Sequence, residues 1–201
     1  MRNQPKPALA QHRSVEEFIA ALEPLPRAQA LADYHKANLQ RFDAAKGSGS
    51  KHQAWPGGYR HHLTQMLNMA YRISGDLFSL YGSHPFHWES VVLAVYFHDI
   101  EKTWKHVPDR LKIDPLPDKM HHLAHELPAL GIQLTDEELN AVAYAHGEPE
   151  ALYDKDRRIM GRLAGLVHAA DVLSARTTFD LDLETTFAQA KEIAAEPGDK
   201  Q

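Results

Sequence analysis

Ala94-Val95-Tyr96-Phe97-His98-Asp99-Ile100-Glu101-Lys102 is the stretch around which the rest of the chain is organised. It completes an unbroken apolar run, Val91–Phe97, which is typical of a buried element. An imidazole and a carboxylate follow that run directly, and burying an unpaired carboxylate costs roughly several kcal/mol. A divalent metal ion would offset this cost, because neutral imidazole and carboxylate are both ordinary metal ligands.

Length and composition limit the classes of protein to consider. A chain of 201 residues fits one domain with a hydrophobic core. The formal net charge of -5 argues against a general binder of nucleic acid or of anionic membranes. Residues 1–13 lack the apolar region of a signal peptide, and no apolar stretch approaches membrane-spanning length. We therefore expect a cytoplasmic protein with no membrane partner.

The amino-acid usage also limits the kind of metal site. The chain has no cysteine, which excludes disulfides, thiolate ligands and cysteine nucleophiles. It has 14 histidines, and they are dispersed through the sequence instead of forming a tract. A bound metal would therefore be held by imidazole nitrogen and carboxylate oxygen, a ligand set that suits Mn, Fe, Co, Ni or Zn better than Mg.

Helical periodicity and capping signals predict an all-α fold. Two capping boxes, Ser14–Glu17 and Thr135–Glu138, each begin a helix. The predicted helices cover residues 14–22, 27–45, 59–80, 88–102, 120–130, 135–146, 156–176 and 181–194. We expect residues 1–54 to form an arm and a helical extension, residues 55–195 a catalytic helical bundle, and residues 196–201 a flexible tail.

The histidine pair at the start of the helix 59–80 is separated by the helical period. His62 shares the apolar stripe with Met66, whereas His61 shares the polar face with Gln65. His62 is therefore the member of the pair that we expect to face inward. A buried histidine that simply bonds a backbone carbonyl would show the same pattern.

Two further helices carry ligand-type residues on their inward sides. Asp171 continues the apolar stripe of the helix 156–176, although aspartate is almost never fully buried without a partner. His168, three residues earlier, could touch the same site or hydrogen-bond Asp171. His146 faces inward at the end of the helix 135–146, where its charged form would also interact favourably with the helix dipole.

Four residues thus combine ligand chemistry with an inward position. A single metal ion would satisfy all of them at once, whereas each taken alone has an ordinary structural explanation. On the helix 120–130 the histidines lie on the flank or the polar face, and periodicity does not choose between them. The four are His62, His98, Asp99 and Asp171, and the further candidates are His146 and one of His121, His122 or His125.

This ordered set resembles the HD-domain superfamily of metal-dependent phosphohydrolases, whose signature is H…HD…D on a helical bundle. The segments that carry the resemblance are Gly57–Leu63, His98–Lys102, His146-Gly147 and Leu166–Leu173, within residues 55–177. The resemblance implies an HD-domain-like single-domain bundle that binds one or two divalent metal ions. The implied ligands are His62, His98, Asp99 and Asp171, with His146 and His122, in preference to His125, available for a second ion.

The resemblance also implies a reaction. A metal-activated water would hydrolyse a phosphomonoester or phosphodiester of a small, nucleotide-like substrate, whereas the acidic balance disfavours long nucleic acid. Lys102 occupies the position of a phosphate-contacting lysine, and Glu101 stands where the family usually has glycine. Glu101 could support a ligand, donate a proton to the leaving oxygen or point outward. The segment after the His-Asp pair is cationic, and its proposed substrate-binding residues are Lys102, Lys105, His106 and Arg110.

Two other functions are compatible with the same residues. Mixed-valent diiron oxygenases of the myo-inositol oxygenase type use a similar H…HD…H…H…D order, hold two irons and activate dioxygen. A non-catalytic HD-like module that binds a nucleotide is the other alternative. The sequence does not indicate the oligomeric state.

Overall fold

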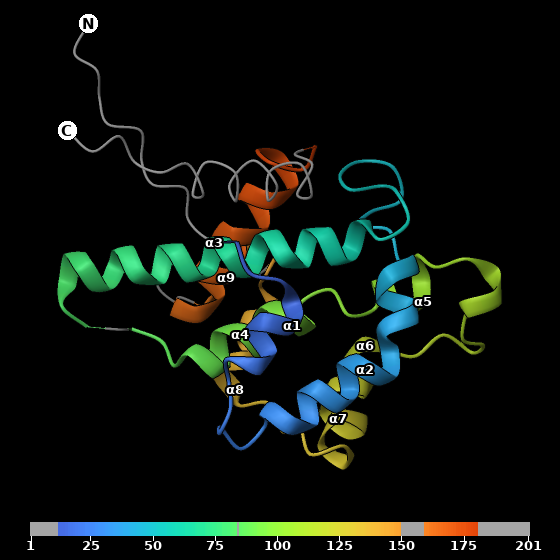
Figure 1. The fold of residues 1–201 in the computed structure, drawn as a ribbon, viewed down its shortest axis with the longest axis horizontal. Coiled ribbons are helices and arrows are strands. Elements are labelled where there is room, and N and C mark those ends of the chain that lie inside the picture. The colour runs from blue at the N-terminus through green and yellow to red at the C-terminus, as the bar shows by residue number, and fades with distance from the viewer. Residues whose placement is uncertain (1–11, 84, 150–158, 181–201) are drawn as a thin grey trace, which may run out of the picture.

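A computed structural model describes residues 12–83, 85–149 and 159–180. All the regular structure of these residues is helical, so the predicted all-α fold is confirmed (Figure 1). In chain order the elements are α1 (Val15–Ala20), α2 (Ala28–Ala44), α3 (Gly58–Tyr81), α4 (Trp88–Phe97), α5 (Lys102–Lys105), the 3-10 turn η1 (Asp109–Leu111), α6 (Lys119–His121), the π-helical turn η2 (His122–Glu126), α7 (Leu127–Ala129), α8 (Asp136–Ala143) and α9 (Arg162–Arg176).

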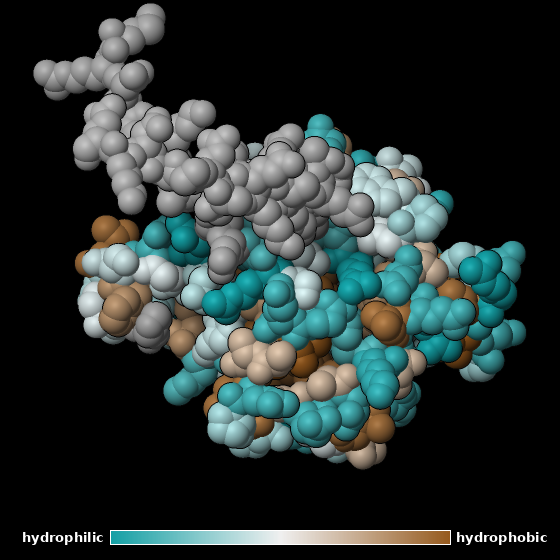
Figure 2. Space-filling view, viewed as in Figure 1, coloured by the Kyte–Doolittle hydropathy of each residue, from teal (hydrophilic) through white to brown (hydrophobic). Residues whose placement is uncertain are grey.

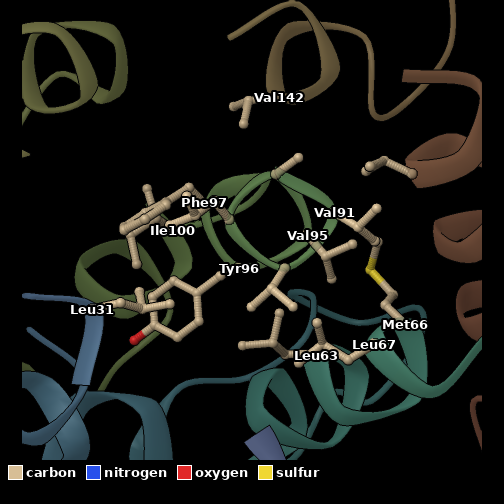
Figure 3. Close-up of a cluster of buried hydrophobic side chains, with 14 of the residues drawn as sticks. Leu31, Leu63, Met66, Leu67, Val91, Val95, Tyr96, Phe97, Ile100 and Val142 are labelled. Carbon is tan, nitrogen blue, oxygen red and sulfur yellow. The ribbon is translucent and has the colours of Figure 1, made fainter. Parts of the chain in front are cut away.

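Helix α4 forms the centre of the hydrophobic core. Every residue from 91 to 100 is buried, so α4 is apolar on all sides, as expected of a helix surrounded by others. Figure 3 shows Leu31 of α2 and Leu63 of α3 beside this helix, with Val142 of α8 across from them. The prediction that the apolar run is a buried element is therefore confirmed.

The helices around α4 bring distant parts of the chain together. Helix α3 packs on α2, α4 and α9, and α9 packs in turn on α4 and α8. In the sequence α3 and α9 are separated by the elements from α4 to α8, yet these two helices lie in contact. This packing places His62 and Asp171 on facing surfaces.

The helix predicted over 88–102 is divided in two. Helix α4 ends at Phe97, residues 98–101 form a turn, and α5 begins at Lys102. Within the turn the amide of Lys102 donates to the carbonyl of Asp99 at 2.9 Å, a spacing of three residues instead of the four of an α-helix. The His-Asp pair therefore lies in the turn, directly after the buried helix.

The structure confirms the predicted starts of two helices and changes the course or the end of two others. Both capping boxes are formed, at Ser14–Glu17 and at Thr135–Glu138. The helix predicted over 120–130 contains the π-helical turn η2, which ends two residues before Pro128, a residue with no amide proton to donate. Helix α8 ends at Ala143, so His146 lies in the following turn and not in the helix. The predicted helix 181–194 and the tail 196–201 lie outside the described residues.

The two N-terminal helices share the core of the bundle. Leu31 and Phe42 of α2 are fully buried in the same apolar cluster as α4. Arg27, just before α2, lies 2.7 Å from Glu89 at the start of α4 and 2.6 Å from Glu138 of α8. Helices α1 and α2 are thus packed on the residues that carry the site.

On the face drawn in Figure 2, hydrophilic residues cover most of the described surface. Large apolar side chains show only in separate patches, as expected where helices turn their apolar stripes inward. Within the described residues, no helix is both long and apolar enough to cross a membrane.

We expect Glu16→Gln to lower the free energy of unfolding by about 1 kcal/mol at pH 7. His35 donates its Nε2 proton to Glu16 at 3.0 Å, and this hydrogen bond, assisted by the charge of Arg60, lowers the pKa of Glu16 to about 2. The ionised carboxylate therefore stabilises the fold above its ordinary pKa of 4.5, and the contribution is lost as the pH falls towards 2. Exposure of 41 % of the side chain limits the effect.

Urea unfolding at pH 7 and at pH 3 measures this contribution. The difference between the wild type and Glu16→Gln should shrink at the lower pH. Glu23→Gln, an exposed glutamate after α1, serves as the control and should change stability little at either pH. An unchanged difference at pH 3 would contradict the assignment.

Candidate metal centre

Three buried residues bring metal-ligand atoms together. Each of His62, His98 and Asp99 offers one ligand atom, and these atoms all lie within 4.8 Å of one another. The residues are 0 %, 0 % and 2 % exposed. Helix α3 supplies the first, and the turn after α4 supplies the other two. The group could hold a metal ion.

The hydrogen bonds of the two imidazoles leave one nitrogen of each facing the group. His98 Nδ1 lies 2.7 Å from the carbonyl oxygen of Val95, and a carbonyl only accepts, so Nδ1 carries the proton. The neutral ring then has its lone pair on Nε2. The Nε2 atoms of both His62 and His98 are buried and make no hydrogen bond. Buried polar atoms without a partner are rare, and a cation would satisfy both lone pairs.

Asp171 lies beside the three-residue group. Its Oδ1 is 3.1 Å from His62 Nε2, but the contact does not have the geometry of a hydrogen bond. Asp171 is 8 % exposed, so the predicted inward position in α9 is confirmed. The structure therefore brings together all four residues of the predicted core ligand set, with Asp171 reaching the group through His62.

Protonation states at neutral pH favour metal binding. Burial lowers the pKa of His62 to about 4, assisted by His98 and Lys102 and opposed by Asp171. Burial alone would raise the pKa of Asp99, but the nearby His98, His146 and Lys102 hold it well below its ordinary value. The pKa of Asp171 is also lowered, since contacts with His62 and His98 outweigh the effect of burial. At pH 7 His62 is thus neutral and both carboxylates are ionised.

Two lysines and Glu101 surround the His-Asp turn. Lys102 Nζ lies 2.5 Å from Asp99 Oδ2, and its side chain is 12 % exposed. Lys119 donates a hydrogen bond to the carbonyl of His98 and lies 3.3 Å from the buried Oε2 of Glu101. Lys102 therefore contacts the proposed ligand set directly, whereas Lys119 holds the turn, and Glu101 is turned towards Lys119.

His146 reaches the same carboxylate from a different loop. Its Nε2 lies 3.3 Å from Asp99 Oδ1, although 63 % of its side chain is exposed. The ion pair with Asp99 raises the pKa of His146. Among the described residues, His168 forms no hydrogen bond with Asp171. Its Nδ1 donates instead to the carbonyl of Ala145 at 2.9 Å. His168 thus supports the turn that carries His146.

The structure does not bring the histidines of residues 121–125 to this group. His122 is buried, and Tyr34 lies 3.0 Å from its Nε2 while Glu126 lies 2.6 Å from its Nδ1. Both ring nitrogens are therefore occupied by side chains. His121 and His125 are exposed, and their rings lie 4.7 Å apart. The expectation that His122 or His125 completes a second metal site gains no support from these contacts.

The cationic segment after the turn is mostly at the surface. Lys105 and Arg110 are exposed, in contrast to Lys102. His106 is partly buried, and its carbonyl accepts a hydrogen bond from the amide of Lys46 at 3.0 Å. Burial and the charges of Lys102 and Lys105 lower the pKa of His106. Of the four residues proposed to bind substrate, Lys102 contacts the three-residue group through Asp99, whereas no direct bond of Lys105, His106 or Arg110 to the group is found among the described residues.

Several residues at the site carry no signal in the sequence. Ser174 Oγ lies 2.8 Å from His62 Nδ1 and 2.7 Å from Gln65 Oε1. Gln65 is 2 % exposed, so its assignment to a polar face was wrong; α9 covers that side of α3. His52, from the loop before α3, has its ring centre 5.1 Å from that of His62. The histidine content is the one signal that could have drawn attention to His52.

Comparisons with protein-family models, curated proteins and solved structures found no match for this chain. The assignment of a function therefore depends on the geometry of the His62, His98 and Asp99 group and on the charges around it.

Proposed function

We propose that the protein is a metal-dependent phosphohydrolase of the HD-domain type, acting on a small, nucleotide-like phosphomonoester or phosphodiester. One observation carries the proposal: two buried imidazole nitrogens without hydrogen bonds converge with the carboxylate of Asp99. His62, His98, Asp99 and Asp171 fit a divalent ion, since the donor set is nitrogen and carboxylate oxygen. Mn, Fe, Co, Ni and Zn suit these donors better than Mg.

A divalent ion held by these residues would supply a Lewis acid and a source of hydroxide at neutral pH. The residues around the ion would orient the ligands and balance charge on the substrate. The His98 and His62 rings are fixed by their Nδ1 bonds, and Lys102 places an ammonium group beside Asp99, where it would balance charge that develops on phosphoryl oxygens. Glu101 is a candidate proton donor to the leaving oxygen, and its pairing with Lys119 holds it near the turn.

The arrangement favours hydrolysis over the diiron oxygenase alternative. A two-iron site would need a histidine from residues 121–125, and the ring nitrogens of His122 are bonded to Tyr34 and Glu126. A module that binds no metal would not need two buried imidazole nitrogens without hydrogen bonds beside two carboxylates. Elemental analysis of the purified protein, followed by a panel of nucleotides and phosphodiesters with Mn, Fe, Ni and Mg, tests the proposal. Metal-loaded protein that hydrolyses none of these substrates would contradict it.

Lys102→Met should separate catalysis from metal binding. We expect kcat for the best substrate of the panel to fall about 100-fold, because an interaction with the phosphoryl group is lost. Metal affinity should stay the same or increase, since a positive charge 2.5 Å from Asp99 is removed. Lys112→Met removes an exposed lysine that pairs with Asp109 and should change neither quantity. A parallel loss of metal in the Lys102 variant would assign this lysine a structural role.

A further inference from the structure

A chain of hydrogen bonds links the backbone after α9 to the ring of His62. The amide Nε2 of Gln65 lies 2.6 Å from the carbonyl oxygen of Thr178. A carbonyl can only accept, so this contact fixes which end of the Gln65 amide is the donor. The oxygen Oε1 of Gln65 must therefore face the other way, towards Ser174.

The hydroxyl of Ser174 transmits this orientation to His62. Ser174 has one proton to donate, and it donates to Gln65 Oε1 at 2.7 Å. Towards His62 Nδ1, at 2.8 Å, the hydroxyl can then only accept. His62 is consequently held with its proton on Nδ1 and its lone pair on Nε2, the nitrogen that lies among the proposed metal ligands.

A branch of the same chain reaches a second imidazole. Gln53 Nε2 donates to Gln65 Oε1 at 2.9 Å and lies 3.3 Å from the hydroxyl of Ser174. The oxygen Oε1 of Gln53 is thereby left to accept the Nδ1 proton of His52, at 2.6 Å. The ring of His52 lies 5.1 Å from that of His62, and charges on Asp171, Asp99 and Lys102 act on it.

The backbone around Gln53 is shaped to hold it in place. Gln53 has φ of 41°, a left-handed conformation that costs a non-glycine residue free energy. A Cβ at Gly58 would come 1.8 Å from the Gln53 carbonyl oxygen, and a Cβ at Gly47 would come 2.8 Å from Gln53 Cβ. Glycine is thus required at both positions, because the chain wraps closely around Gln53. An unfavourable backbone conformation persists only where the surrounding structure enforces it, and such residues are frequent at functional sites.

We propose that Gln65 and Ser174 are positioning residues that hold His62 in the Nδ1–H tautomer, and that the Gln53 branch holds His52 in the same tautomer at the edge of the metal centre. This inference rests on the proposed metal centre, because holding one tautomer matters for a ligand imidazole, which must present a free lone pair to the ion. Buried polar groups can also bond one another for stability alone. The two roles differ in what happens to the His62 ring when one member is removed.

Nitrogen NMR of the metal-free protein at pH 8 reads the tautomers directly, without any catalytic assay. In the wild type, His62 and His52 should both carry the proton on Nδ1. Ser174→Ala should give His62 a mixture of both tautomers. Gln65→Met should favour the Nε2–H form instead, because the Ser174 hydroxyl then becomes free to donate to His62 Nδ1. Gln53→Asn should release His52 and leave the tautomer of His62 unchanged.

Mn²⁺ and Ni²⁺ affinities, measured by titration calorimetry on the full chain, give the second measurement. Ser174→Ala and Gln65→Met should each bind these ions 10–100-fold more weakly, roughly the effect of losing an outer-shell partner. The control is Ser74→Ala, which removes a buried serine hydroxyl elsewhere on α3 and should change neither the tautomers nor the affinity. Folding of each variant is checked by its thermal transition.

The outcomes separate this inference from the proposed function. A Ser174→Ala protein whose His62 stays entirely in the Nδ1–H form would overturn the relay, as would a wild type with the proton on Nε2. Wild-type metal affinity in both variants would show that the bonds serve stability alone. Protein that binds metal and shows the tautomer changes, but hydrolyses no phosphoester, would contradict the proposed reaction and leave the relay supported.

Discussion

Asp99→Asn is expected to bring the metal content of the purified protein close to background and to reduce phosphoester hydrolysis by about 10³-fold or more. Asp99 is 2 % exposed, and its carboxylate lies 3.3 Å from His98 Nε2, 3.3 Å from His146 Nε2 and 2.5 Å from Lys102 Nζ. Asparagine keeps the shape of the side chain but removes the negative charge that a divalent ion needs. Elemental analysis and turnover of the best substrate in the panel measure the two losses.

The matched control is Asp109→Asn. Asp109 lies ten residues further along, in the exposed turn η1, and its carboxylate is 93 % exposed in a pair with Lys112. The control should keep both the wild-type metal content and the wild-type rate. If Asp99→Asn retained full metal content, the ion would have to be bound elsewhere and the proposed centre would be wrong.

The features that the sequence could predict are those with periodicity. An unbroken apolar run predicted that α4 is buried, and the structure surrounds that helix on all sides. The helical period separated His62 from His61 and placed Asp171 on an inward stripe, so the positions of these two ligand candidates followed from facing directions alone. The other two candidates, His98 and Asp99, lie in the turn that directly follows α4.

The features that the sequence could not predict depend on which other parts of the chain pack against a given residue. Gln65 has the spacing of a polar face, but α9 packs over that face and buries it. Lys119 reaches the His98 carbonyl because the loop after α5 folds back, and no repeat or motif marks that path. His122 has the chemistry of a ligand, yet Tyr34 and Glu126 take up both of its nitrogens.

Two polar clusters of the bundle, one around Arg27 and one around His62 and His98, differ in how far their hydrogen bonds are satisfied. Arg27 bonds Glu89 and Glu138, and each charge in that cluster has a hydrogen-bonded partner of opposite sign. Such a cluster is complete within the protein. Around His62 and His98, by contrast, two ring nitrogens are left without hydrogen bonds. Because an unsatisfied buried polar atom costs about 1–3 kcal/mol, this cluster is intelligible if it binds a further group.

Leu31→Ala is expected to lower the free energy of unfolding by about 3 kcal/mol, within the usual range of about 2–5 kcal/mol for a buried leucine. Leu31 is fully buried in α2 and packs beside α4 (Figure 3). The loss arises because the cavity removes contacts with the central helix, so the whole bundle should unfold in one transition at lower denaturant. Urea unfolding followed by far-UV circular dichroism measures it.

Leu80→Ala provides the control, since Leu80 near the end of α3 is 73 % exposed and its loss should change stability by less than about 0.5 kcal/mol. The comparison also tests how the N-terminal helices relate to the rest. If α1 and α2 were an accessory to a separately stable core, Leu31→Ala would produce an early partial transition and leave the main one unmoved. A single shifted transition would mean that α2 stabilises the same core that positions His98 and Asp99.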